Sequence, residues 1–147
     1  MTSDPNHTPR ILIGFDFGMK RIGVAIGQTI TQTARPLDTI LAKDGVPNWN
    51  AVTKLIKKWL PDALVVGIPL NMDGTDQPIS KQARLFADAL RERFQLSVHE
   101  MDERLTTKDA RERLFISGGY KALQDGQVDR VAAQLILQNW FTEKLNK

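Results

Sequence analysis

The 147-residue chain contains no cysteine. This absence excludes disulfide bonds, thiolate metal sites and cysteine nucleophiles, and it fits a protein of the reducing cytoplasm. The chain also lacks a run of 18 apolar residues, so we expect no transmembrane helix and no membrane partner. Its first ten residues, MTSDPNHTPR, lack the apolar segment of a secretory signal. We therefore expect residues 1–9 to form a disordered tail.

The chain also has little excess of one sign of charge, because its net charge is only +3. So small an excess does not separate a nucleic-acid-binding protein from an ordinary soluble surface of mixed charge. The composition, 41% hydrophobic and 25% charged, is that of a globular protein. Length and composition together predict a single domain over residues 10–147.

The pattern of apolar residues predicts alternating strands and helices. We expect strands at residues 10–16, 22–27, 37–41, 63–67 and 96–101, and helices at about 49–60, 78–94, 108–116 and 127–145. The first two strands are separated by five residues, which predicts an antiparallel hairpin. Residues 63–67, ALVVG, are wholly apolar, as in a strand buried on both faces. The order predicts an α/β domain with a mixed five-stranded sheet and helices on both faces.

Acidic side chains stand at the ends of these predicted elements. Asp16 closes the first strand, Asp102 and Glu103 close the last one, and Asp129 lies in the first turn of the final helix. Ligands of open α/β sheets bind at the carboxyl ends of the strands. Carboxylates that converge there repel one another unless a hard cation, such as Mg²⁺ or Mn²⁺, lies between them. Two such ions can activate water and stabilise a leaving oxygen in phosphodiester cleavage.

Each acid also has an ordinary structural interpretation. Asp129 could favour the helix by pairing with its dipole, and Asp16 could order the turn that follows its strand. Glu103 and Arg104 could form an exposed ion pair. The residue pattern alone leaves both interpretations open.

Four stretches in fixed order carry a resemblance to one family. They are DFGMKRIGVAIG at residues 16–27, VVGIPLNMDGT at 65–75, DERLTT at 102–107 and DRVAAQLIL at 129–137. These motifs resemble those of the YqgF or RuvX family, whose members are described as pre-16S rRNA nucleases and Holliday junction resolvase-like proteins. The resemblance covers about residues 11–140, and it implies an RNase H-like fold with a metal-dependent nuclease centre.

The resemblance also implies roles for individual residues. Asp16, Glu103 and Asp129 would be the catalytic acids and would bind a pair of Mg²⁺ or Mn²⁺ ions, with Asp102 as a further ligand. Arg130 follows Asp129 where relatives often have a small residue, and it could contact a phosphate. In total, we expect five residues to contact nucleic acid: Lys20, Arg21, Asn71, Arg104 and Arg130.

The function implied is an endonuclease that matures the 5′ end of 16S rRNA, with structured RNA as substrate and association with the ribosome. One alternative is a Holliday junction resolvase acting on branched DNA, and another is a non-catalytic RNA- or ribosome-binding module. A third, an ATP-dependent enzyme of the actin and sugar kinase type, requires two such domains and more chain than 147 residues. We expect a monomer or a weak homodimer.

Aromatic side chains carry two weaker expectations. Trp49, Trp59 and Trp140 lie on apolar helical stripes, so we expect them to pack in the core rather than to stack on bases. Tyr120 lies in a polar, glycine-containing segment and could stack on a base.

Overall fold

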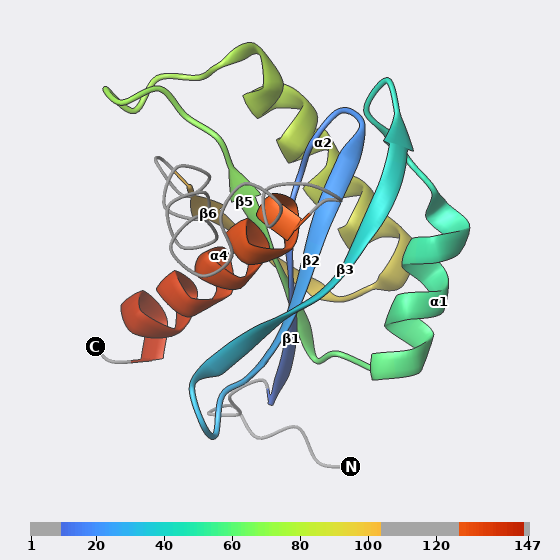
Figure 1. Cartoon of the computed structure of the whole chain (residues 1–147), viewed down its shortest axis with the longest axis vertical. Helices are drawn as coiled ribbons and strands as arrows, with labels where there is room; N and C mark the ends of the chain where they lie inside the picture. Colours follow the sequence, from blue (N-terminus) through green and yellow to red (C-terminus); the bar gives the residue numbers. More distant parts are fainter. Residues whose placement is uncertain (1–9, 104–126, 146–147) are drawn as a thin grey trace.

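The structure is a computed structural model that describes residues 10–103 and 127–145. Its centre is a six-stranded sheet in the order β4-β3-β2-β1-β5-β6 (Figure 1). The strands are β1 (Ile11–Asp16), β2 (Arg21–Gln28), β3 (Thr33–Lys43), β4 (Val46–Pro47), β5 (Ala63–Ile68) and β6 (Ser97–Asp102). The described helices are α1 (Trp49–Trp59), α2 (Pro78–Phe94) and α4 (Gln127–Leu145). Residues 108–116, where the sequence predicts a further helix, lie outside the described residues, as do residues 1–9 and Tyr120.

The sheet is mixed, as the sequence predicts. Strand β2 is antiparallel to both β1 and β3, and β4 is antiparallel to β3. Strand β5 is parallel to both β1 and β6. The carboxyl ends of β1, β5 and β6 therefore meet at one edge of the sheet, the edge at which ligands of such sheets bind.

One side of the sheet differs from the sequence prediction. Strand β3 covers Thr33–Lys43 rather than 37–41, and the two-residue strand β4 is one more than the five strands expected. Both lie at the end of the strand order, where one long side of β3 is largely open. Because most β3 side chains are exposed or half-buried, the apolar pattern that marks a strand is weak there. Pro36 and a bulge opposite Val24 and Ala25 interrupt this edge, as is common in edge strands.

Local signals fix the ends of the helices. The Asn48 side chain accepts a hydrogen bond from the Ala51 N–H at 3.3 Å at the start of α1, and the helix ends at Leu60 in a left-handed conformation. Pro78 is the first residue of α2, and the Ser80 hydroxyl accepts a hydrogen bond from the Gln77 N–H at 2.8 Å. Among the described helices, none is both long and apolar enough to span a membrane.

The two faces of the sheet carry separate apolar cores. Helices α1 and α2 pack on one face, and α4 packs on the other (Figure 1). On the α4 face the strands present glycines, which let the helix approach the backbone closely. A Cβ atom at Gly14 would lie 2.6 Å from Cγ of Leu137, and one at Gly27 would lie 2.9 Å from the Phe141 ring. This packing sets the position of the first turn of α4 relative to the carboxyl ends of the strands.

Candidate active site

Asp16 lies at the carboxyl end of β1 with a glycine on each neighbouring strand. It pairs with Gly23 of β2 and with Gly67 of β5. Because side chains at paired positions share a face of the sheet, the missing side chains leave room beside Asp16 on the α4 face. The Asp16 side chain is nevertheless buried, with 8% of the residue exposed. The space beside it is therefore filled by groups from other elements.

Glu103 fills the space over Gly67. It directly follows β6, and its N–H donates to the Ile68 carbonyl at 3.2 Å, which extends the pairing of β5 and β6 by one residue. A Cβ atom at Gly67 would lie 2.6 Å from Oε2 of Glu103 and would also collide with Ile136 of α4. Glu103 is 7% exposed. The sequence prediction placed it at the end of the last strand but did not anticipate this burial.

The carboxyl groups of Asp16 and Glu103 share a hydrogen bond. Burial raises the pKa of Asp16 to about 7, because a buried carboxylate loses its hydration; the hydrogen bond opposes this rise. The pKa of Glu103 is raised further, to about 10, by burial, by the charge of Asp16 and by the hydrogen bond. The hydrogen bond thus favours the charged form of Asp16 and the neutral form of Glu103.

Asp129 stands in the first turn of α4 on the other side of Asp16. A Cβ atom at Gly23 would collide with the Asp129 carbonyl group, so the backbone of this helical turn rests directly on β2. Asp129 is half-buried, and its charge contributes to the raised pKa of Asp16. The structure thus brings the three acids expected from the sequence to one edge of the sheet. Asp102 also lies there, exposed at the end of β6, and its charge contributes to the raised pKa of Glu103.

Gly23 and Gly67 make close contacts in this site that the sequence interpretation did not anticipate. Their signal was present, since a glycine inside a strand often marks a close approach of another backbone or a ligand. The sequence did not reveal which group approaches each glycine, because this depends on where α4 and β6 pack.

The donor set suits a divalent cation. Carboxylate oxygens are hard ligands of the kind that Mg²⁺ and Mn²⁺ prefer. Oε2 of Glu103 is buried and has no hydrogen-bond partner in the part of the chain that the structure describes. A buried acceptor without a donor is costly, and a cation would remove this cost. The described side chains contain no group of three His, Cys, Asp or Glu already arranged as ligands.

Basic side chains flank the acids. The turn that carries Lys20 and Arg21 is held in place because the Lys20 carbonyl accepts from the Ala42 N–H at 2.8 Å, while both side chains are exposed. Arg130 is half-buried, and its Nη1 lies 3.5 Å from the Thr39 hydroxyl of β3. Arg104, the remaining cation expected at the site, lies outside the described residues.

The loop between β5 and α2 begins at the same edge of the sheet. Its Asn71 amide donates to the Thr75 hydroxyl at 3.0 Å and to the Asp76 carbonyl at 3.2 Å. Asp76 is held in turn by two hydrogen bonds from Arg84 of α2, at 2.7 and 2.9 Å. The structure therefore gives Asn71 a role in shaping this loop, in addition to the nucleic-acid contact that the sequence predicts for it.

Comparison with known proteins identifies the family. The sequence model of RuvX, described as Holliday junction resolvase, matches residues 10–143. The chain belongs to the RuvX family. A protein of Aeromonas salmonicida with the name "Putative pre-16S rRNA nuclease" is 60% identical over 135 residues, which cover 92% of this chain and 96% of that protein. A Shewanella oneidensis protein of the same name is 55% identical over 132 residues, 90% of this chain and 94% of that protein.

Solved structures show the same fold at low sequence identity. Thermus thermophilus RuvC in complex with a Holliday junction substrate has a TM-score of 0.58 and 15% identity, covering 94% of this RuvX chain and 97% of that chain. The fowlpox virus Holliday junction resolvase has a TM-score of 0.54 and 16% identity, covering 92% and 99%. These findings confirm the predicted family, the RNase H-like α/β fold and the nuclease class for this RuvX protein. The roles assigned to individual site residues stay predictions.

Proposed function

We propose that this nuclease is a metal-dependent endonuclease that cleaves precursor 16S rRNA during maturation of its 5′ end. The observation that carries the proposal is the buried, hydrogen-bonded pair of Asp16 and Glu103 at the carboxyl edge of the sheet, with Asp129 beside it. Paired carboxyl groups with raised pKa values are typical of functional sites. The names of the relatives favour precursor 16S rRNA as the substrate. Such a protein would act in the cytoplasm and associate with the maturing ribosome.

Each group at the edge has a part in this proposal. Asp16, Glu103 and Asp129 would hold Mg²⁺ or Mn²⁺, with Asp102 as a further ligand. A cation pair bound there would supply an activated water and stabilise the leaving oxygen of the phosphodiester. The exposed Lys20 and Arg21 and the half-buried Arg130 would orient the RNA by neutralising its phosphates. Arg104 would add a further phosphate contact.

Cleavage of precursor 16S rRNA by the purified protein, with Mg²⁺ or Mn²⁺ added, tests the proposal. We expect specific cleavage by the wild type and none by Asp16→Asn. The matched control is Asp44→Asn, because Asp44 is an exposed acid in a turn with a φ of 51°, a conformation that Asn also tolerates. Equal cleavage by the wild type and Asp16→Asn would refute the assigned site. If Asp16→Asn also sustained ribosome maturation in cells, a non-catalytic RNA- or ribosome-binding module would account for the protein instead.

A resolvase of branched DNA is the second candidate. It is favoured by the description of the family and by the fold shared with structures of Holliday junction resolvases. Symmetric nicking of a junction requires two active sites, so this function predicts a dimer on the substrate, whereas rRNA cleavage is compatible with a monomer. A four-way DNA junction offered beside precursor 16S rRNA, with the mass of each complex measured, separates the two functions.

A further inference from the structure

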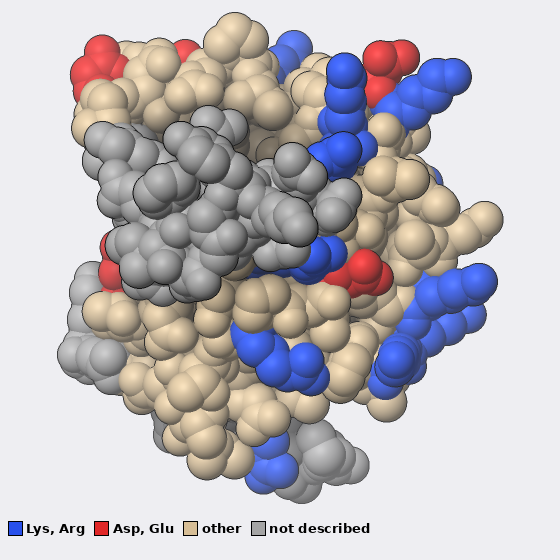
Figure 2. Space-filling view, in the orientation of Figure 1, with Lys and Arg blue, Asp and Glu red and all other residues tan. Residues whose placement is uncertain are grey.

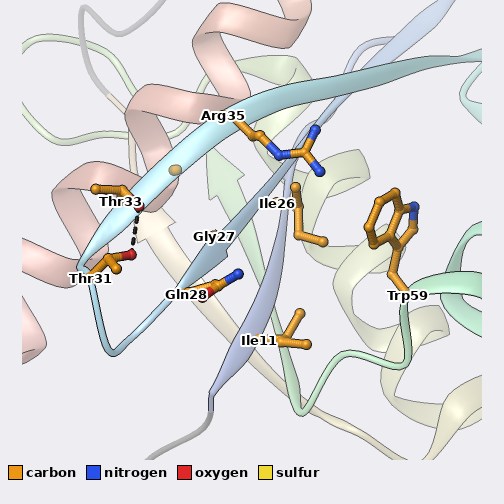
Figure 3. A pocket seen from close by; sticks show the side chains of 9 residues that line it. Ile11, Ile26, Gly27, Gln28, Thr31, Thr33, Arg35 and Trp59 are labelled. Carbon is orange, nitrogen blue, oxygen red and sulfur yellow. Dashed lines mark hydrogen bonds between the residues drawn. The ribbon is translucent and has the colours of Figure 1, made fainter.

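A groove lies on the α1 face of the sheet at the end opposite the acids. It has a volume of about 460 Å³, which is within the roughly 300–1,000 Å³ of pockets that hold small ligands. Ile11 of β1 and Ile26 of β2 form its apolar floor, and Gln28 and Thr33 line one end (Figure 3). Trp59, from the last turn of α1, forms the opposite wall (Figure 3).

Trp59 is half-buried and has two cations near its ring. The guanidinium carbon of Arg35 lies 5.4 Å from the centre of its ring, and Nζ of Lys58 lies 5.3 Å from it. Figure 3 shows the Arg35 side chain reaching from β3 toward the Trp59 ring across the groove. Trp59 packs against the apolar core, as the sequence predicts, but part of its ring remains accessible. An aromatic face beside a planar guanidinium group is a surface on which a nucleobase stacks well.

Positive charge continues beyond Trp59. A second groove, of about 330 Å³, shares Trp59 with the first and adds Lys54 and Lys58, with Asp38 as the acidic residue of its lining. Figure 2 shows Lys and Arg side chains gathered over β3 and α1, with fewer acidic ones among them. Asp62, the acid near Ile11, accepts hydrogen bonds from the N–H groups of Arg10 and Ile11 at 3.0 and 2.9 Å. The two grooves thus combine an apolar floor, an aromatic wall and cations, which suits a strand of alternating bases and phosphates.

The groove is separate from the acidic edge. On β2, Gly23 pairs with Asp16 whereas Gln28 lines the groove, and five residues of an antiparallel strand span about 17 Å. The acids face α4, whereas Ile26 belongs to the core under α1 and α2. At about 3.4 Å per stacked nucleotide, this length alone corresponds to roughly five nucleotides, and the path from one face of the sheet to the other adds to it. A single RNA molecule could therefore occupy both sites by passing around the β3 edge.

We propose that this groove is a second nucleic-acid-binding site that receives an unpaired segment of the RNA substrate. One base would stack on Trp59 and Arg35, and the neighbouring phosphates would contact Lys58 and Lys54. The site would hold the RNA at a distance from the scissile bond and so help select its cleavage position. The inference rests on the proposed function only in taking the substrate to be RNA.

Binding of a short, unstructured single-stranded RNA to metal-free Asp16→Asn protein tests the inference without cleavage. Fluorescence anisotropy would be measured over a series of salt concentrations for that protein and for the same protein with Arg35→Gln and Lys58→Gln added. The matched control adds Arg93→Gln and Lys57→Gln instead, because Arg93 lies 4.0 Å from the ring centre of Trp49 and neither residue lines a described groove. Both pairs remove the same charge. A fourth protein carries Trp59→Leu, with its thermal unfolding measured to confirm folding.

We expect the Arg35 and Lys58 substitutions to weaken binding about tenfold, because they remove one cation beside the stacked base and one phosphate contact. The slope of log affinity against log salt should become less steep by about 0.7 for each phosphate that the protein no longer binds. The control pair should change both quantities much less. Equal effects of the two pairs, or weakened binding of an acidic peptide but not of RNA, would overturn the inference. Loss of precursor rRNA cleavage in wild type would instead count against the proposed function, since the binding assay does not depend on it.

Discussion

Gly67 and Glu103 fit against each other so closely that the strand has no room for a side chain at position 67. A Cβ atom there would lie 2.6 Å from Oε2 of Glu103 and would collide with Ile136 as well. The pairing of Gly67 with Asp16 places this contact beside the first acid. The position of the buried glutamate is therefore determined by a glycine on a strand to which it does not belong.

The first prediction follows from this contact. Gly67→Ala should reduce cleavage about a hundredfold, because a displacement of a catalytic group by about 1 Å can have that effect. It should also lower the free energy of unfolding by about 1–3 kcal/mol, the usual effect of overpacking. Activity and urea denaturation would be measured together. Gly14→Ala is the matched control, since its Cβ would lie 2.6 Å from Leu137 of the same helix rather than against Glu103.

The comparison of these two variants is what makes the measurement informative. Both should lose stability, but only Gly67→Ala should lose most of its activity. Equal losses of activity in the two variants would show that α4 packing, rather than the position of Glu103, limits cleavage.

The second prediction concerns the pH dependence of the metal-free protein. Burial raises the pKa of Asp16 from its ordinary value of 3.8 to about 7. Between these values the folded state binds more protons than the unfolded state, so the free energy of unfolding falls as the pH rises. Asp16→Asn removes this ionisation and keeps an oxygen that can accept the hydrogen bond from Glu103. The variant should therefore be more stable than the wild type at neutral pH, by on the order of 1–3 kcal/mol.

Urea denaturation in the presence of a chelator, repeated across this pH range, measures the effect. The advantage of Asp16→Asn should shrink as the pH falls toward about 4, where the wild-type carboxyl group is protonated in the folded state and about half protonated in the unfolded state. A variant less stable than the wild type at every pH would contradict the raised pKa of Asp16.

The third prediction is that a divalent cation reverses this order of stability. Mg²⁺ or Mn²⁺ bound to the folded state should stabilise the wild type by about 2.7 kcal/mol when its concentration is one hundred times the Kd. Thermal unfolding with and without metal would show a higher Tm for the wild type when metal is present. Asp16→Asn and Glu103→Gln should lose the shift, whereas Glu92→Gln, an exposed acid of α2, should keep it. The same shift in all four proteins would argue against a metal at this edge.

The sequence predicts those features of the site that depend on local residue patterns. Apolar runs ending at Asp16 and near Glu103, and an acid in the first turn of the last helix, were enough to place three carboxyl groups at strand and helix ends. The short hairpin and the parallel crossovers then brought these ends to one edge. Only this topology was needed, and topology follows from element order and connection length.

The remainder depends on packing between distant segments. The burial of Glu103, and hence its raised pKa, results from Ile136 and Gly67 meeting around it. Strand β3 was predicted too short because its exposed edge does not require apolar residues. Trp59 was predicted to lie in the core, but its accessible face depends on where α1 ends relative to β3.

The fourth prediction concerns Arg130, which lies beside Thr39 at the start of α4. Arg130→Gln should raise KM for RNA with little effect on kcat, because a phosphate contact positions the substrate without entering the chemistry. The salt dependence of binding should become less steep by about 0.7–0.9. Arg130→Lys should restore the charge and most of the affinity. An unchanged KM in Arg130→Gln would assign the side chain to holding α4 against β3 instead.

The fifth prediction tests whether Asn71 acts by shaping the loop that follows β5 or by contacting the substrate directly. Because the Asn71 amide holds Thr75 and Asp76, Asn71→Ala should loosen this loop, and amide hydrogen exchange should speed up at Gly74 and Thr75. Both N–H groups are useful reporters, since Gly74 donates to the Asn71 carbonyl at 2.8 Å and Thr75 donates to the Asp73 side chain at 2.9 Å. Asn139→Ala, at an exposed position of α4, is the control. If Asn71→Ala weakens RNA binding with unchanged exchange, Asn71 contacts the substrate directly; faster exchange with weaker binding shows that it acts by shaping the loop.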